Sequence, residues 1–395
     1  DSIMPIGNSF LQIPINHTDI SQSELNIDEK VRSNLFPWNG QFSPQFIEAL
    51  LSNYASSDFF VIDPFAGSGT VLCECARKRI SAYGIELNAS AYHMAKNYEL
   101  ANLSDVERSE IINKVDILIY SIDCSTFIIP TLKHEIDFSK IPAYKNILST
   151  LVILMDIPNR DVALNHLQKK WESLKKALYE IPTSDKCIHV DKGDARHLHL
   201  YDSSADLLIT SPPYINVFNY HQKYRKSVEL LGYDVLSTAK TEFGSNRKNR
   251  GNRFLTVIQY CIDMALSMNE ARRTCKDASR MIYIVGRESS VLGYSFCNSE
   301  LVYKIGTEIF FFDFVLRQER MFKNRFGQII YEDILHFFNN KSQNLTSSEI
   351  ISKARNIAID IIQEKINLSN DNPNKPLLVE ALKKVSKVKP SEEVV

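Results

Sequence analysis

A short apolar run, residues 59–62, leads directly into a glycine turn and then into a segment with helical character up to about Arg79. An unbroken apolar run is typical of a strand that is buried on both faces of a parallel sheet. The order strand, glycine turn, helix is that of loops that bind nucleotide-type cofactors. The turn reads Asp63-Pro64-Phe65-Ala66-Gly67-Ser68-Gly69-Thr70. It lacks the lysine of a Walker loop, and Leu72 stands where the dinucleotide fingerprint has its third glycine, so these two common loops are excluded.

A second strand is expected from Ala82 to Glu86, and it ends in a carboxylate. Taken alone, a glutamate at a strand end is most often a solvated loop residue. After a glycine loop of this kind, an acid at the end of the second strand is placed to bind ribose hydroxyls, and we favour that role for Glu86.

A helix is expected to begin shortly before the glycine loop. Ser43 and Pro44 fit the N-cap and the first helical position. The N-terminus of this helix is a candidate carboxylate site, because its N–H groups and dipole favour an anion. Most helices that begin in this way bind nothing.

The segment Thr210-Ser211-Pro212-Pro213-Tyr214 follows another apolar run, residues 205–209. Neither proline can donate a hydrogen bond to a neighbouring strand, and each restricts the residue before it, so the strand ends in a rigid loop. This loop holds a hydroxyl, free carbonyls and an aromatic face close together, which suits a planar, hydrogen-bonding group such as a nucleobase. An ordinary strand-terminating turn explains the five residues alone equally well.

The chain after Tyr214 is rich in aromatic, amide and basic side chains. Tyr220, Tyr224 and Arg225 are mixed with His221 and Gln222 rather than confined to one helical face. This mixture suits the stacking and edge recognition of a base that has left its duplex.

A basic run without acids follows between Gly244 and Arg253, and its cations are Arg247, Lys248, Arg250 and Arg253. Such a run is usually a solvated loop, but beside a base-binding segment we favour phosphate contacts. The net charge of −1 argues against an overall basic coat. Local patches of this kind must therefore supply any phosphate affinity.

Composition indicates a soluble globular protein, with 395 residues of which 44% are hydrophobic and 24% charged. The seven cysteines are odd in number and lack paired metal spacing, so we interpret them as reduced core thiols in a cytoplasmic protein and expect no metal. The most apolar run, residues 147–157, is too short to span a bilayer. No signal peptide is visible, and no membrane partner is expected.

The remaining patterns predict how the chain is organised. We expect an N-terminal arm at 1–35, a catalytic domain at 36–340 and a helical extension at 341–395, which begins with a capping box between Thr346 and Glu349. Residues 101–186 carry a helical stripe and form either a DNA-facing lobe or a solvated cover, while 215–255 form a DNA-facing loop region. Further strands are expected at 187–190, 281–285, 309–312 and 329–338, with a basic turn at 320–325 between the last two.

The glycine loop, Glu86 and the later Ser-Pro-Pro-Tyr loop together resemble the S-adenosylmethionine-dependent DNA methyltransferases that modify exocyclic amino groups. Members of this family make N4-methylcytosine or N6-methyladenine, and the resemblance covers residues 36–340. It implies an α/β fold: a doubly wound, mostly parallel, seven-stranded Rossmann-like sheet with helical insertions and a C-terminal helical extension. S-adenosylmethionine is the implied cofactor, and double-stranded DNA is the implied partner.

The resemblance also implies roles for individual residues. Phe42, Ser43 and Pro44 would face the methionine carboxylate of the cofactor, and Glu86 would bind its ribose. Asp194, in the turn after the strand at 187–190, would accept a hydrogen bond from the adenine amino group. The loop beneath the cofactor would consist of Asp63, Pro64, Phe65, Gly67, Gly69 and Thr70.

The expected chemistry centres on Ser211, Pro212, Pro213 and Tyr214. An exocyclic amino nitrogen is a poor nucleophile, because its lone pair is delocalised into the ring. The Ser211 hydroxyl and a carbonyl of Ser211 or Pro212 would accept its N–H bonds and favour a pyramidal nitrogen in the transition state. Tyr214 would stack on the base, which must leave the duplex to reach this loop.

The sequence favours cytosine N4 over adenine N6 as the target, because adenine enzymes of the family more often carry Asp or Asn at the position of Ser211. A modification enzyme with a cognate restriction endonuclease is the biological setting that the resemblance implies. Adenine-N6 methylation of DNA, methylation of RNA and a non-catalytic DNA- or cofactor-binding role are the alternatives.

Overall fold

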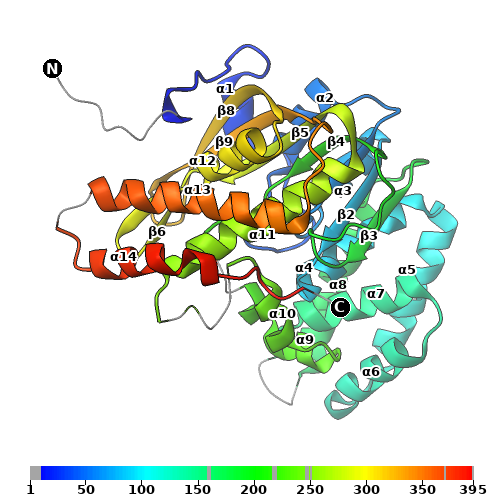
Figure 1. Cartoon of the computed structure of the whole chain (residues 1–395). Helices are drawn as coiled ribbons and strands as arrows, with labels where there is room; N and C mark the ends of the chain where they lie inside the picture. Colours follow the sequence, from blue (N-terminus) through cyan, green and yellow to red (C-terminus); the bar gives the residue numbers. More distant parts are fainter. Residues whose placement is uncertain are drawn as a thin grey trace. The chain divides into compact units, whose positions relative to one another are not determined.

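The computed structural model describes residues 10–157, 162–215, 220–244, 249, 251–368 and 371–393 (Figure 1). The chain divides into two compact units. Unit 1 comprises Asp1–Glu29, Asp194–Phe218 and Ala239–Val395, and unit 2 comprises Lys30–Gly193 and Asn219–Thr238.

Seven strands form one sheet in the order β3-β2-β1-β4-β5-β9-β8. Their bounds are β1 (Phe60–Asp63), β2 (Ser81–Glu86), β3 (Ile188–Lys192), β4 (Ala205–Thr210), β5 (Cys275–Gly286), β8 (Asp313–Lys323) and β9 (Ile329–Phe338). β2 pairs in parallel with β1 and β3, and β4 with β5, whereas β9 is antiparallel to both β5 and β8. The expectation of a mostly parallel, seven-stranded α/β sheet is therefore confirmed. The strand order reverses after β1, as in doubly wound folds.

Unit 2 contains β1, β2 and β3 and the helices that lie near them in the sequence. Four long helices occupy the region between β2 and β3 that was expected to interrupt the alternation: α5 (Asp105–Ser121), α6 (Ile128–Phe138), α7 (Pro142–Leu154) and α8 (Leu164–Glu180). The stripe of α8 buries Leu167, Trp171, Leu174 and Leu178, as its spacing predicts. Unit 2 also contains α2 (Pro44–Tyr54), α3 (Thr70–Lys78), α4 (Ala89–Lys96) and α9 (Arg225–Leu230), and α10 (Val235–Thr241) begins in unit 2 and ends in unit 1.

Unit 1 contains β4, β5, β9 and β8 with a helical layer. Its helices are α11 (Phe254–Thr274), α12 (Asn298–Lys304), α13 (Ser347–Leu368) and α14 (Lys375–Lys384), and a small hairpin joins β6 (Glu288–Val291) to β7 (Tyr294–Cys297). The predicted capping box of α13 is present, because Thr346 and Glu349 each accept the other's backbone N–H. α13 packs against both α11 and α14 (Figure 1).

Residues 10–29 lie along β8 within unit 1. It contains η1 (Phe10–Gln12) and α1 (Gln22–Asn26). Asn16 donates its backbone N–H to the Arg317 carbonyl at 2.7 Å, and the Arg317 guanidinium stacks 4.6 Å from the centre of the Phe10 ring.

The prediction of a strand at 309–312 is wrong. Residue 309 ends the π-helical turn η6 (Ile305–Ile309), Phe311 has a left-handed φ of 52°, and the strand begins only at Asp313. The aromatic residues of this run pack against each other instead. The rings of Phe310 and Phe312 stack with their centres 5.4 Å apart. The expected turn at 320–325 is also wrong, because β8 extends to Lys323 and the turn closes where Asn324 donates to the Gln328 carbonyl.

The cysteines are all free, but their interpretation as core thiols needs one correction. Cys73, Cys75, Cys261 and Cys275 are buried, Cys124 and Cys297 are half-buried, and Cys187 is exposed. Cys187 lies just before β3 begins, so it is a surface residue at a strand end rather than part of the core.

Candidate cofactor loop and candidate base-binding loop

The glycine loop of unit 2 begins at the carboxyl end of β1 and ends at the N-terminus of α3. Asp63 is buried, and its Oδ1 accepts the Phe65 N–H at 3.1 Å. Gly69 precedes α3 with a φ of 95°, and a Cβ there would lie 2.8 Å from Cδ2 of Tyr98. Glycine is thus required at position 69 both by the backbone conformation and by space.

Gly67 has a different environment. Its φ is 56°, and a Cβ at this position would meet no atom of the described residues within 4 Å. The surface of the loop above Gly67 is therefore open, and a ligand can approach the backbone closely there.

Glu86, at the end of β2, braces this loop. Its Oε1 accepts the Gly67 N–H at 3.0 Å, and its Oε2 accepts the Asn88 N–H at 3.0 Å. Burial raises the pKa of the Glu86 carboxyl, while these backbone N–H groups oppose the rise. Each carboxylate oxygen has more than one lone pair, so Glu86 retains acceptor capacity for a ribose hydroxyl. The sequence predicted that ligand role and missed the bracing role.

Two side-chain hydrogen bonds tie the glycine loop to the segment before α2. Ser68 donates its hydroxyl to Gln41 Oε1 at 2.6 Å, and Thr70 donates to Asn34 Oδ1 at 2.9 Å. Asn34 in turn donates to the Phe42 carbonyl at 2.7 Å. The predicted cofactor residues at 42–44 and 63–70 are therefore one connected structure within unit 2.

The start of α2 agrees with its prediction in position. Ser43 is the N-cap and Pro44 opens the helix, but the Ser43 hydroxyl makes no capping bond. Ser43 Oγ is buried and lacks a hydrogen-bond partner among the described residues. A buried hydroxyl without a partner at a helix N-terminus is available to donate a hydrogen bond to an anion.

Asp194 lies in unit 1 and is buried. Arg196 holds it through a short chelate, with Nε 3.0 Å from Oδ1 and Nη2 2.6 Å from Oδ2, and the Arg196 backbone N–H donates to Oδ1 at 2.9 Å. The carboxylate is thus fixed in orientation. Its role as acceptor for an adenine amino group stays a prediction.

The Ser211–Tyr214 loop follows β4 in unit 1, and side chains from two helices fix its backbone. Tyr260 of α11 donates its hydroxyl to the Pro213 carbonyl at 2.6 Å. Asn298 of α12 accepts the Ile215 N–H at 3.0 Å and donates to the Gly286 carbonyl at 3.1 Å. The Ser211 hydroxyl has no hydrogen-bond partner within the part of the chain that the structure describes.

The Tyr214 ring rests on the end of β5. A Cβ at Gly286 would lie 2.8 Å from Cζ of Tyr214, so only glycine leaves room for the ring. The Tyr214 hydroxyl lies 3.5 Å from Glu332 Oε1, and Arg320 donates to the other oxygen of Glu332 at 3.2 Å. The sequence missed Tyr260, Asn298 and Glu332. Gly286, directly after the strand predicted at 281–285, was the one local sign in the sequence that a ring packs there.

The predicted DNA-contacting residues are described only in part. Tyr224 has a left-handed φ of 59°, and the Lys223 ammonium lies 5.1 Å from its ring centre and 5.4 Å from that of Trp38. Arg225 pairs with Glu229 at 2.7 Å, and Arg253 is exposed directly before α11. Arg247, Lys248, Arg250 and the side chain of Tyr220 lie outside the described residues.

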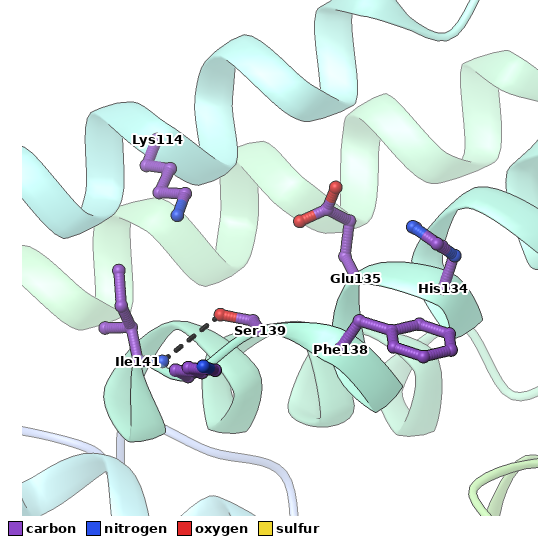
Figure 2. A pocket seen from close by; sticks show the side chains of 7 residues that line it. Lys114, His134, Glu135, Phe138, Ser139 and Ile141 are labelled. Carbon is purple, nitrogen blue, oxygen red and sulfur yellow. Dashed lines mark hydrogen bonds between the residues drawn. The ribbon is translucent and has the colours of Figure 1, made fainter.

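A pocket of about 400 Å³ lies on the helices of unit 2 (Figure 2) and is lined by Lys114, His134, Glu135, Phe138, Ser139, Lys140 and Ile141. None of the predicted site residues lines it. Among the residues with described positions, no group of three or more His, Cys, Asp or Glu side chains is arranged to hold a metal ion, and no helix is both long and apolar enough to cross a membrane.

The family model for DNA methylases matches residues 11–97. This segment includes the start of α2, the glycine loop and Glu86, whereas Asp194 and the Ser211–Tyr214 loop lie beyond it. The match begins ahead of residue 36, within the segment that was expected to be an arm.

The Type II methyltransferase M.MjaII of Methanocaldococcus jannaschii is 35% identical over 66 residues, which are 16% of this chain and 12% of that relative. The chain therefore matches a small part of the relative's length. Among solved structures, an S-adenosylmethionine-dependent methyltransferase of Methanosarcina mazei aligns over 73% of this chain and 96% of its own, with 10% identity and a TM-score of 0.36. A geranyl diphosphate C-methyltransferase of Streptomyces coelicolor aligns over 76% and 86%, with 8% identity and a TM-score of 0.31.

Proposed function

We propose that this chain, whose residues 11–97 match the family model for DNA methylases, transfers a methyl group from S-adenosylmethionine to the exocyclic amino group of a base in duplex DNA. The observation that carries the proposal is the Ser211–Tyr214 loop. Its backbone is held by Tyr260 and Asn298, while the Ser211 hydroxyl is left without a partner among the described residues. A rigid loop with an available acceptor is what positioning of an amino group requires.

The residues present fit the cofactor. The open surface above Gly67 accepts a ligand close to the backbone, and the unpaired Ser43 hydroxyl at the start of α2 suits a carboxylate. In this proposal Glu86 binds the ribose hydroxyls and Asp194 the adenine amino group. When bound, the cofactor supplies an activated sulfonium methyl group.

The chain's own residues orient the acceptor. The Ser211 hydroxyl and a carbonyl of Ser211 or Pro212 accept the two amino hydrogens, which localises the nitrogen lone pair for attack. The nitrogen–carbon bond forms as the carbon–sulfur bond breaks, and the amino group then releases one proton to water. Tyr214, held on Gly286, stacks on the displaced base.

Cytosine N4 is the target we favour, on the strength of Ser211, and adenine N6 is the alternative. The proposed setting is a restriction-modification system in the cytoplasm of a bacterial or archaeal cell, with a cognate endonuclease as partner. Tyr224, Arg225 and Arg253, together with Tyr220, Arg247, Lys248 and Arg250, are proposed to contact the DNA.

A transfer assay with labelled S-adenosylmethionine tests the substrate class. Duplex DNA and total cellular RNA are incubated with the full chain in parallel, and the label in each polymer is counted. We expect label in DNA and none in RNA. Label in RNA alone would show that RNA, not DNA, is the substrate. Cofactor binding measured by calorimetry, without methyl transfer to either polymer, would indicate a non-catalytic role.

A further inference from the structure

The hairpin formed by β8 and β9 in unit 1 extends past the rest of the sheet. The last register pair between β5 and β9 joins Gly286 to Glu332. β8 and β9 stay paired beyond that point, through Met321–Tyr331, Phe322–Ile330 and Lys323–Ile329. At about 3.4 Å per residue, these further pairs add about 10 Å before the turn. We call residues 321–331 the β8–β9 tip.

The tip projects past the same sheet edge that carries the Ser211–Tyr214 loop. β4 and β5 are parallel, so their carboxyl ends, at Thr210 and Gly286, lie at one edge. β9 is antiparallel to β5 and begins at that edge, so the turn from β8 to β9 lies beyond it. A duplex that presents a base to Tyr214 also lies beyond this edge, because a displaced base stays joined to its strand.

One face of the tip continues the surface on which Tyr214 rests. Arg320 and Glu332 are paired in register, and Phe322 lies on the same face as Arg320 because side chains alternate along a strand. The Tyr214 hydroxyl lies 3.5 Å from one oxygen of Glu332, and Arg320 donates to the other. The Arg320 guanidinium also lies 5.2 Å from the centre of the Phe322 ring. A continuous row of contacts therefore connects Tyr214 to the tip.

The turn at the end of the tip has a fixed shape. Asn324 Oδ1 accepts the backbone N–H groups of Phe326 at 2.9 Å and of Gln328 at 3.0 Å. The Asn324 N–H donates to the Gln328 carbonyl at 2.9 Å, and Gly327 has a left-handed φ of 78°. The backbone that carries Arg325 and Phe326 is thus ordered before a ligand binds, which lowers the entropic cost of binding.

The tip combines exposed apolar side chains with cations and contains no acid. Its large apolar side chains are at least 36% exposed, and they are Met321, Phe322, Phe326, Ile329 and Tyr331. Lys323 and Arg325 are exposed, and no carboxylate of the described residues pairs with either. The Arg325 guanidinium lies 4.7 Å from the centre of the Phe326 ring, which is 73% exposed. Exposed apolar surface of this kind marks a binding site, and cations without acids favour a polyanion.

We propose that the β8–β9 tip is a contact surface for duplex DNA, in which Lys323 and Arg325 bind phosphates and Phe326 packs against the bases. Displacement of a base opens the stack, and apolar side chains on a rigid projection can enter such an opening. The inference rests on the proposed function, and it adds the part of unit 1 that binds the duplex beside the displaced base.

A double variant, Lys323→Gln with Arg325→Gln in the full chain, tests the phosphate contacts. Fluorescence anisotropy with a labelled duplex of mixed sequence gives the dissociation constant at a series of salt concentrations. The slope of log affinity against log salt concentration should become shallower by about 1.8, because each lost phosphate contact removes about 0.9. Lys276→Gln is the control. It removes an exposed cation where β5 begins, at the opposite edge of the sheet, and should leave the slope unchanged.

Phe326→Ala tests the contact with bases. Initial rates of methyl transfer to unmodified genomic DNA give kcat/KM for DNA, which we expect to fall about 5- to 50-fold because a base loses a stacking partner. The salt slope of duplex binding should stay at the wild-type value, since no charge is removed. Phe311→Ala is the matched control. Phe311 is 47% exposed and precedes β8 at the opposite edge of the sheet, so kcat/KM should not change.

An unchanged slope in the double variant, together with an unchanged kcat/KM in Phe326→Ala, would overturn the inference. If these variants instead altered the oligomeric state in size-exclusion chromatography, the tip would be a contact between copies of the chain. The substituted side chains are exposed, so folding should be retained, and either variant decides the case if the other does not fold. A wild-type chain that methylates no DNA is a failure of the proposed function, and it is seen before any variant is made.

Discussion

The two units each fix a strand-end loop, but they use different chemistry. In unit 2 a carboxylate, Glu86, holds the backbone of the glycine loop. In unit 1 the backbone of the Ser211–Tyr214 loop is held by uncharged groups, the Tyr260 hydroxyl and the Asn298 amide.

The same contrast appears between two groups of buried, hydrogen-bonded side chains, one inside each unit, which we call junctions. His93 of unit 2 pairs with Asn146 of α7 at 2.7 Å and with the Tyr233 hydroxyl at 2.8 Å, and burial lowers its pKa to about 4, so the junction is neutral near pH 7. Asp263 of unit 1 is the centre of a charged junction. A buried charge costs more free energy than a buried neutral network unless it is paired and hydrogen-bonded. The Asp263 carboxylate is paired with Arg196 and with the Ser391 hydroxyl, while the His93 junction joins α4 to α7.

The largest effect is expected from removing the Tyr214 ring. Tyr214→Ala should lower turnover by about 10- to 100-fold, because the base loses a stacking surface worth about 1–3 kcal/mol. Cofactor affinity should stay within about twofold of the wild type, since the glycine loop is unchanged. Single-turnover kinetics and calorimetry measure the two quantities. An equal loss of turnover and of cofactor affinity would contradict the separate roles of the glycine loop and the Ser211–Tyr214 loop.

The two junctions should respond to pH with opposite signs. The pKa of His93 is lowered from 6.5 to about 4, so between these values the unfolded chain binds more protons and stability rises with pH. The pKa of Asp263 is raised from 3.8 to about 6, chiefly by burial, so the folded chain binds more protons in that range and stability falls as pH rises. Each contribution is on the order of 3 kcal/mol.

Urea unfolding between pH 4 and pH 6.5 separates the two junctions. His93→Gln should make the slope of the unfolding free energy against pH more negative, because it deletes a positive contribution. Asp263→Asn should make the slope more positive. If both variants shifted the slope in the same direction, the contrast between a neutral and a charged junction would be wrong.

A smaller effect is expected at the brace of the glycine loop. Glu86→Gln places an amide NH2 against the N–H of Gly67 or of Asn88, so one hydrogen bond is lost whichever way the amide turns. Cofactor affinity should weaken about tenfold, and turnover at saturating cofactor should change little. Calorimetric titration checks this, and an unchanged dissociation constant would remove Glu86 from the cofactor site.

Much of the fold follows from local patterns in the sequence. The runs before Asp63, Glu86 and Ser211 predict strands because uninterrupted apolar residues suit a sheet that is covered on both faces. The turns after them are predicted because glycine and proline determine backbone conformation locally. The aromatic run at 309–312 misled the prediction, since apolarity alone does not distinguish a strand from a packed turn.

The supports of the site could not be predicted in this way. Tyr260 and Asn298 reach the Ser211–Tyr214 loop from helices far along the chain, and Ser391 reaches Asp263 across an even longer separation. Such contacts exist only after folding, and no local spacing encodes them. The sequence therefore predicts which groups would bind and react, and the structure adds which groups hold them.

Nucleoside analysis of methylated DNA tests the central claim most directly. Duplex DNA is incubated with the full chain and deuterated S-adenosylmethionine, digested to nucleosides and analysed by mass spectrometry. The account predicts deuterated N4-methyldeoxycytidine. Deuterated N6-methyldeoxyadenosine alone would contradict the choice of base, and the absence of any deuterated nucleoside would contradict the proposed methyl transfer.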